Sequence, residues 1–223
     1  MLLAIDTSTD WTGIALFDGT QVIAEQIWRG KHFQSVELVP TIQTLFNKSN
    51  VSIDQLSGVG VATGPGSFTG LRIGMSAAKG FALAKKLPIV GIPSLDILVT
   101  AQPGLRRPMI AILQLGRGRF AWQRYVYKNK AWQAEHELRM DDAKAIAATI
   151  KSPVYVVGDL DIETRQVFGR KWKTTQLAPA ALCVRRPAVL AELAWHKIKN
   201  KQADDPATLS PIYVHTINNP LNL

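Results

Sequence analysis

The stretch GPGSFTGLRIG, residues 64–74, raises the question of whether this chain binds a nucleotide, because a glycine-rich loop between a strand and a helix is a common phosphate-binding site. A Walker A loop would need Gly-Lys-Ser/Thr, but Gly70 is followed by Leu-Arg. A dinucleotide fingerprint has the spacing GxGxxG, whereas Gly64, Gly66 and Gly70 give GxGxxxG. Both nucleotide-binding patterns therefore fail on spacing.

The alternative is that the loop serves the backbone. Gly64, Pro65 and Gly66 favour a sharp turn where side chains would clash. Either Ser67 or Thr69 then caps the helix that follows.

That helix, expected over residues 69–85, has a face of small and apolar residues. They recur every three or four positions, at Gly70, Gly74, Ala77, Ala78 and Phe81. Such a face lets another backbone approach closely. The pattern itself leaves open whether the partner helix lies in this chain or in another one.

The composition is that of an ordinary globular protein, with 223 residues of which 47% are hydrophobic. Cys183 is the single cysteine, so an internal disulfide is excluded, which suits a reducing compartment. The N-terminus has no basic region ahead of an apolar run, and no apolar run approaches 18 residues. We therefore expect a cytoplasmic protein without a signal peptide or membrane span.

The net charge of +9 is unevenly distributed, since 19 of the 26 Lys and Arg lie after residue 104, against 10 of the 17 Asp and Glu. Tryptophans lie among these cations. One interpretation is a nucleic-acid surface, with Arg117, Arg119 and Arg124 as candidate tRNA contacts. The other interpretation is a solvated surface that binds nothing.

The order of predicted elements repeats along the chain. Three strands, with a hairpin turn at Asp18-Gly19, precede a helix over residues 33–48 that contains Pro40. A strand, the glycine loop, the long helix, another strand and a short helix over residues 94–101 follow, so the order is βββαβαβα, which begins with the series βββαβα. After a Pro-Gly turn a similar series begins, which predicts domains 1–103 and 104–223.

Three motifs carry a resemblance to a known family: AIDTST near the N-terminus, GPGSFTGLRIG, and GIPSLDIL. Together they resemble the bacterial TsaB (YeaZ) family, strongly over residues 1–100 and weakly beyond, with GPGSFTGLRIG the most specific. The resemblance implies an α/β fold of two tandem actin-like ATPase (ribonuclease H-like) domains, with mixed sheets flanked by helices.

The resemblance also implies a function. Members of this family are accessory, non-catalytic subunits that pair with TsaD, with TsaE as the third, nucleotide-hydrolysing member. The complex forms threonylcarbamoyladenosine beside the anticodon of tRNAs. We expect the pairing surface on the two N-terminal helices, which would also serve a homodimer when TsaD is missing. The expected interface residues are Phe33, Val36, Val39, Leu71, Gly74, Ala77, Ala78 and Phe81.

The first loop bears on catalysis. ATPases of this superfamily carry an aspartate and a glycine here, whereas this chain reads Asp6, Thr7, Ser8, Thr9. The glycine is missing, so we interpret the loop as vestigial, with Asp6 accepting hydrogen bonds from its neighbours. We expect no cofactor of the chain's own, and ATP or ADP only in the assembled complex. The alternatives are an ATP-dependent phosphotransferase, or a tRNA-docking module that uses the basic second half.

The sequence contains no pattern typical of a metal site or of a catalytic cysteine. The four histidines are far apart and HExxH is absent, so no metal site is expected. Cys183 has no neighbours typical of a nucleophile. The family's Asp-Ala-Arg at the second domain's first strand is replaced here by a stretch that begins at Gln114, which puts any role of that aspartate in doubt.

Overall fold

The computed structural model describes residues 1–30, 34–116, 118–171 and 173–214. It divides into two compact units. The first consists of Met1–Ile97 together with Arg186–Ile212, and the second of Leu98–Arg185 with Tyr213 and Val214.

The first unit is built on a five-stranded mixed sheet with the order β3-β2-β1-β4-β5. Strand β1 pairs antiparallel with β2 and parallel with β4. The β2–β3 turn is held by Asp18, whose Oδ1 accepts from the backbone N–H of Thr20 and Gln21 at 2.7 Å. The strands are β1 (Leu2–Asp6), β2 (Trp11–Phe17), β3 (Val22–Arg29), β4 (Gly58–Gly64) and β5 (Ile89–Pro93).

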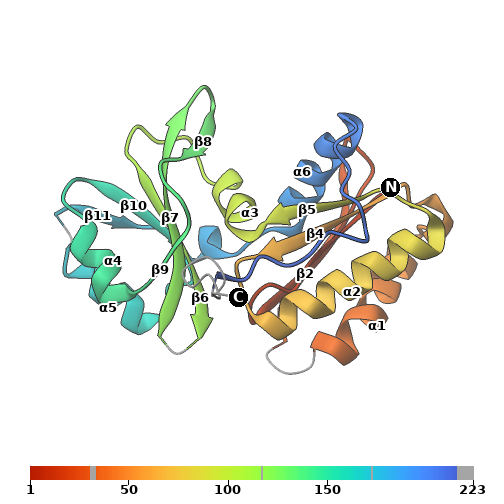
Figure 1. Cartoon of the computed structure of the whole chain (residues 1–223), viewed down its shortest axis with the longest axis horizontal. Helices are drawn as coiled ribbons and strands as arrows, with labels where there is room; N and C mark the ends of the chain where they lie inside the picture. The colour runs from red at the N-terminus through yellow and green to blue at the C-terminus, as the bar shows by residue number, and fades with distance from the viewer. Residues whose placement is uncertain (31–33, 117, 172, 215–223) are drawn as a thin grey trace, which may run out of the picture. The chain divides into compact units, whose positions relative to one another are not determined.

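Helices cover both faces of this sheet (Figure 1). Helices α1 (Gln34–Lys48) and α2 (Phe68–Lys85) pack on one face, over a core that includes Leu3 and Ile5 of β1. Helix α6 (Pro187–Lys199) packs on the other face, over Leu2 and Ala4. Successive residues of β1 therefore serve opposite cores, as the two-residue period of a strand requires. The short helices η1 (Ile53–Gln55) and α3 (Ser94–Thr100) complete the elements of this part of the chain.

The second unit repeats this topology. Its sheet has the order β11-β10-β6-β7-β8, and β9 also pairs with β7. Strand β6 pairs antiparallel with β7 and parallel with β10, as β1 does with β2 and β4. The strands are β6 (Met109–Gly116), β7 (Arg119–Lys128), β8 (Ala131–Ala134), β9 (Arg139–Asp142), β10 (Val154–Gly158) and β11 (Thr175–Leu177).

Helices α4 (Ala143–Thr149) and α5 (Ile162–Gly169) pack on the second sheet. Ile146 and Phe168 are buried there against apolar residues of β6 and β10. A further short helix, η2 (Ala180–Cys183), precedes the return of the chain to the first unit. The expected α/β class, with mixed sheets flanked by helices, is therefore confirmed.

The predicted division at residue 103 differs from the structure in two respects, the smaller being that residues 98–103 belong to the second unit. Residues 186–212 belong to the first unit and not to the second. The reason is the apolar stripe of α6, in which Leu190, Ala191 and Ala194 are buried against the first sheet. Gly60 of β4 permits this contact, since a Cβ there would lie 2.7 Å from the Cβ of Ala194.

Candidate partner interface

The first loop, residues 6–9, is closed by its own hydrogen bonds. Asp6 Oδ1 accepts from the backbone N–H of Ser8 at 2.8 Å and from Ser8 Oγ at 2.5 Å. All four side chains, Asp6 to Thr9, are buried. The predicted role of Asp6 as acceptor for its neighbours is confirmed.

The glycine loop packs directly on this first loop. Ser67 N–H donates to the carbonyl oxygen of Ser8 at 2.6 Å, and a Cβ on Gly66 would lie 1.9 Å from that oxygen. Gly70 approaches the carbonyl of Thr7 in the same way, with a Cβ distance of 2.2 Å. The glycines therefore allow two backbone segments of the same unit to touch, which explains their presence without a phosphate.

The residues predicted to form the turn and the helix cap lie at the end of β4 and at the start of α2. Gly64 has a φ of +105°, and the Gly64–Pro65 peptide bond is cis. Ser67 is the N-cap of α2, where its side chain accepts from the Gly70 N–H at 3.3 Å, whereas Thr69 is exposed on the first turn. Of the two predicted caps, Ser67 is correct and Thr69 is wrong, because Thr69 already lies inside the helix.

The small-residue face of α2 is used inside the unit, which corrects the predicted interface. Leu71, Gly74 and Ala78 are buried. A Cβ on Gly74 would lie 2.3 Å from Thr7 Oγ1, which itself donates to the Gly70 carbonyl at 2.6 Å. These residues pack α2 on its own sheet and are not available to a partner helix.

The opposite faces of α1 and α2 form an exposed apolar groove. Its volume is about 450 Å³, and it is lined mainly by Ser35, Leu38, Val39, Phe68, Arg72 and Ile73. Val39 is 53% exposed and Phe68 56%, while Val36 beside them is 64% exposed. Large apolar side chains gathered in this way are typical of protein-binding surfaces. We call this surface the α1–α2 groove.

The remaining predicted interface residues fall on or near this surface. Ala77 lines the groove and Phe81 is half-buried one turn further along α2. Arg72 lies over the ring of Phe68, at 5.3 Å from its centroid, and adds a cation to the rim. Phe33 lies outside the described residues. Helix α1 buries Leu38, Ile42, Leu45 and Phe46, so Val36 and Val39 face away from the core.

The basic residues that follow residue 104 do not all belong to one unit. Arg119 is exposed at the start of β7, and Arg124 forms an ion pair with Glu135 at 3.2 Å. Arg117 lies outside the described residues. The lysines near the end of α6 belong to the first unit, because that helix packs on the first sheet. The cations after residue 104 are thus divided between two units.

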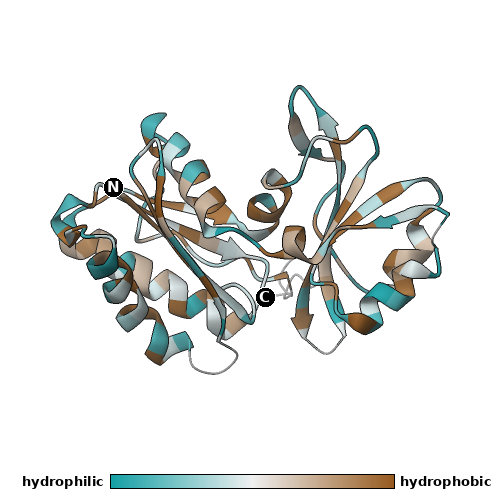
Figure 2. Ribbon diagram, turned by 180° about the vertical axis from the view of Figure 1, so that it is seen from behind, coloured by the Kyte–Doolittle hydropathy of each residue, from teal (hydrophilic) through white to brown (hydrophobic). Residues whose placement is uncertain are grey.

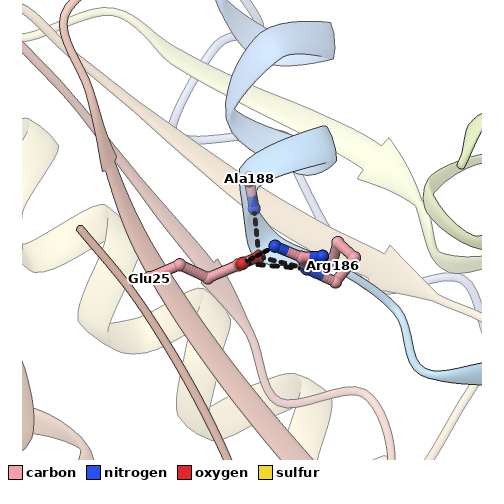
Figure 3. A network of polar contacts seen from close by, with 3 residues as sticks. All are labelled: Glu25, Arg186 and Ala188. Atoms are coloured by element: carbon pink, nitrogen blue, oxygen red, sulfur yellow. Dashed lines mark hydrogen bonds and ion pairs between the residues drawn. The ribbon is translucent and has the colours of Figure 1, made fainter. Parts of the chain in front are cut away.

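One polar network was missed by sequence reasoning (Figure 3). Arg186 pairs with both carboxylate oxygens of Glu25 of β3: its Nε donates to Oε1 at 3.0 Å and to Oε2 at 2.8 Å, and its Nη2 contacts Oε2. Glu25 Oε1 also accepts from the backbone N–H of Ala188 at 3.0 Å. Helix α6 has no cap from its own N-cap side chain, so Glu25 supplies one from a distant strand. The hydrogen bond to Glu25 raises the pKa of Arg186.

Histidine and cysteine chemistry adds nothing to the site. Within the described residues no group of His, Cys, Asp and Glu is arranged to hold a metal ion. His32 and His215 lie outside those residues. Burial raises the pKa of the Cys183 thiol, whose Sγ lies 3.8 Å from the Ala178 carbonyl. Among the described helices none is long and apolar enough to cross a membrane.

Comparison with known proteins agrees with the sequence motifs. Residues 29–147 match the family model of TsaD, tRNA N6-adenosine threonylcarbamoyltransferase. The tRNA threonylcarbamoyladenosine biosynthesis protein TsaB of Bacillus subtilis is 31% identical over 217 residues, 96% of this chain and 93% of that protein. TsaB of Escherichia coli is 32% identical over 140 residues, 60% of this chain and 59% of that one.

Solved structures agree on the fold. YeaZ from Pseudomonas aeruginosa superposes with a TM-score of 0.75 at 19% identity, covering 96% of this chain and 99% of that one. The ethanolamine utilization protein EutJ from Carboxydothermus hydrogenoformans gives a TM-score of 0.52 at 12% identity, covering 85% and 88%. On the extent of its identity to the Bacillus subtilis protein, the chain belongs to the TsaB family of tRNA threonylcarbamoyladenosine biosynthesis proteins.

Proposed function

We propose that this chain is a non-catalytic subunit that pairs with a TsaD-type transferase through the α1–α2 groove. A TsaE-type protein is the third member of the complex. The single observation that carries the proposal is the exposure of Val39 and Phe68 in one groove on two adjacent helices, with Val36 also exposed one turn before Val39. Burying such side chains in an interface stabilises a complex.

The first loop supports the non-catalytic part of the proposal. A magnesium-binding aspartate must offer its carboxylate to the ion, but Asp6 is buried and accepts two hydrogen bonds from Ser8. The backbone of Ser8 is in turn covered by the glycine loop, through the hydrogen bond from Ser67 N–H. On this proposal ATP or ADP is bound only in the assembled complex.

Sequence similarity between this chain and TsaD-type proteins supports pairing through equivalent helices of the two proteins. The region that matches the TsaD family model includes both α1 and α2. The tRNA N6-adenosine threonylcarbamoyltransferase of Fervidobacterium nodosum is 34% identical over 137 residues, 52% of this chain and 40% of that protein. Two related domains can pair through equivalent helices about a pseudo-two-fold axis, as identical subunits do in a dimer. The same surface would serve a homodimer when the chain is alone.

The experiment is co-purification with the TsaD homologue of the same organism, read by size-exclusion chromatography with light scattering. Wild type should form a one-to-one complex. The double variant Val36→Asp/Val39→Asp should not, because two charges would be desolvated in the interface. Ile162→Asp is the matched control, since Ile162 is 77% exposed on α5 of the other unit.

Both variants should melt close to the wild-type temperature, because the substituted side chains are exposed. Equal complex formation by Val36→Asp/Val39→Asp and Ile162→Asp would exclude the α1–α2 groove. A chain that ignores the TsaD homologue altogether would exclude the partnership.

A further inference from the structure

The hairpin formed by β7 and β8 extends beyond the other strands of its sheet (Figure 1). Its end is hydrophilic (Figure 2). Tyr127 of β7 pairs with Trp132 of β8, and Lys128 with Ala131. The turn between them has positive φ at Asn129 (+53°) and Lys130 (+62°), as tight two-residue hairpins require.

An aromatic pair lies at this end of the sheet. The rings of Tyr127 and Trp132 are 5.3 Å apart at an interplanar angle of 63°, and Tyr127 is 41% exposed. The indole Nε1 of Trp132 is buried and has no hydrogen-bond partner among the described residues. Gly104 packs on the Tyr127 ring, since a Cβ there would lie 2.5 Å from Cζ. The segment before β6 is thereby held against the hairpin.

Cations surround this pair. The segments 103–108 and 125–134 contain Arg106, Arg107, Lys128 and Lys130, and no Asp or Glu. All four cationic residues are exposed. Gly104 packs on the Tyr127 ring, and Arg106 and Arg107 follow that contact by two and three residues along the chain. We call these six side chains, the four cations with Tyr127 and Trp132, the hairpin patch.

We propose that the hairpin patch binds an unpaired stretch of RNA. An exposed aromatic ring beside several cations is the combination with which proteins hold single-stranded nucleic acid: a base stacks on the ring, and the flanking phosphates contact the cations. An acidic peptide would satisfy the cations but would leave the ring without a planar partner. The inference rests on the proposed function for the source of the RNA, a loop of the tRNA.

The patch differs from the predicted tRNA contacts. Arg124 is engaged with Glu135, and Arg119 begins β7 at the opposite end of that strand from Tyr127. The hairpin patch therefore makes a separate prediction. Removal of its charges should weaken binding, whereas removal of cations elsewhere on the unit should not.

The test is fluorescence anisotropy of the full chain, without any partner, with a labelled single-stranded RNA and with tRNA over a range of salt concentrations. Tyr127→Leu keeps an apolar contact for Gly104 but removes the stacking face, and should raise Kd about tenfold. Lys128→Gln/Lys130→Asn should lower the salt slope by about 1 to 2. Asparagine is chosen at position 130 because it tolerates the positive φ.

The control is Lys144→Gln/Lys151→Gln, which removes the same charge from exposed positions on and after α4. It should bind RNA as wild type does. The proposal is overturned if the hairpin double variant matches this control, or if a polyglutamate peptide binds the wild type more tightly than the RNA. Because no TsaD homologue is present in the assay, the RNA-binding result can be interpreted even if the proposed pairing with TsaD is wrong.

Discussion

Gly74→Ala should destabilise the isolated chain, although alanine ordinarily stabilises a helix relative to glycine. The new Cβ would lie 2.3 Å from Thr7 Oγ1, well inside the closest contact a Cβ normally makes. Thr7 is buried, and its Oγ1 donates to the Gly70 carbonyl, so its displacement disturbs a buried hydrogen bond. Gly80→Ala in the same helix is the matched control, because nothing lies within 4 Å of its Cβ position.

The magnitude follows from the two sites. Overpacking costs about 1–3 kcal/mol, and a buried polar group left unpaired costs about 1–3 kcal/mol more. Replacing glycine by alanine in a helix interior raises the free energy of unfolding by about 1 kcal/mol, and this gain applies at both positions. Because this last term cancels between the two variants, their free energies of unfolding should differ by about 2–6 kcal/mol.

Thermal and urea unfolding of the two variants measures this difference directly. For a chain of this size each kcal/mol corresponds to about 2–4 °C in Tm. Gly74→Ala should melt below wild type and Gly80→Ala slightly above it. If Gly74→Ala were as stable as Gly80→Ala, Gly74 would not be packed against Thr7, and its assignment to the unit's own core would be wrong.

Two other predictions concern polar contacts. Glu25→Gln should lower the free energy of unfolding by about 1–2 kcal/mol, because Arg186 loses its ionic partner and the hydrogen bond that caps Ala188 N–H weakens. Urea unfolding measures this loss, and an unchanged free energy of unfolding would show that the network does not anchor α6. Hydrogen bonds from Thr164 lower the pKa of the Asp161 carboxyl from its ordinary value, so the ionised carboxylate stabilises the folded state at any pH above that ordinary value. The stability lost in Asp161→Ala should therefore shrink as the pH falls through the lower folded-state pKa, and a pH-independent difference in melting would contradict this.

The sequence predicted most of the local structure. The apolar run in LLAIDT and the Asp18-Gly19 turn indicate the first strands, and the structure has β1, β2 and β3 with that turn. The long helix was expected from residue 69 and begins at Phe68. Residues 131–134 and 139–142 form two separate short strands, β8 and β9, and both pair with β7. Local patterns indicate extended backbone, but pairing decides where a strand ends.

Two failures have a common physical cause. The period of an apolar stripe shows that a helix buries one face, but it does not show against what. Helix α6 was assigned to the second half by its position, yet it packs on the first sheet. The small-residue stripe of α2 likewise fits any close neighbour, and that neighbour is the first loop of the same unit. Contacts across more than a hundred residues, such as Glu25 with Arg186, leave no local pattern.

The candidate interface was predicted in part. Val36 and Val39 were expected at the interface, and the structure turns both valines outward, whereas Ile42 and Leu45 of the same helix are buried. Phe68 was not predicted, although it is exposed at the first position of α2. A large apolar residue directly after an N-cap serine, where the first turn is usually solvated, is a signal that could have identified it.

Hydrogen–deuterium exchange of the chain with and without its TsaD homologue tests the central claim most directly, because it reports the contact surface without any substitution. The account predicts that amide exchange over α1 and α2 slows when the complex forms. Exchange over helices α4 and α5 of the second unit should stay as it is in the free chain. Protection confined to the second unit, with α1 and α2 exchanging as they do in the free chain, would contradict it.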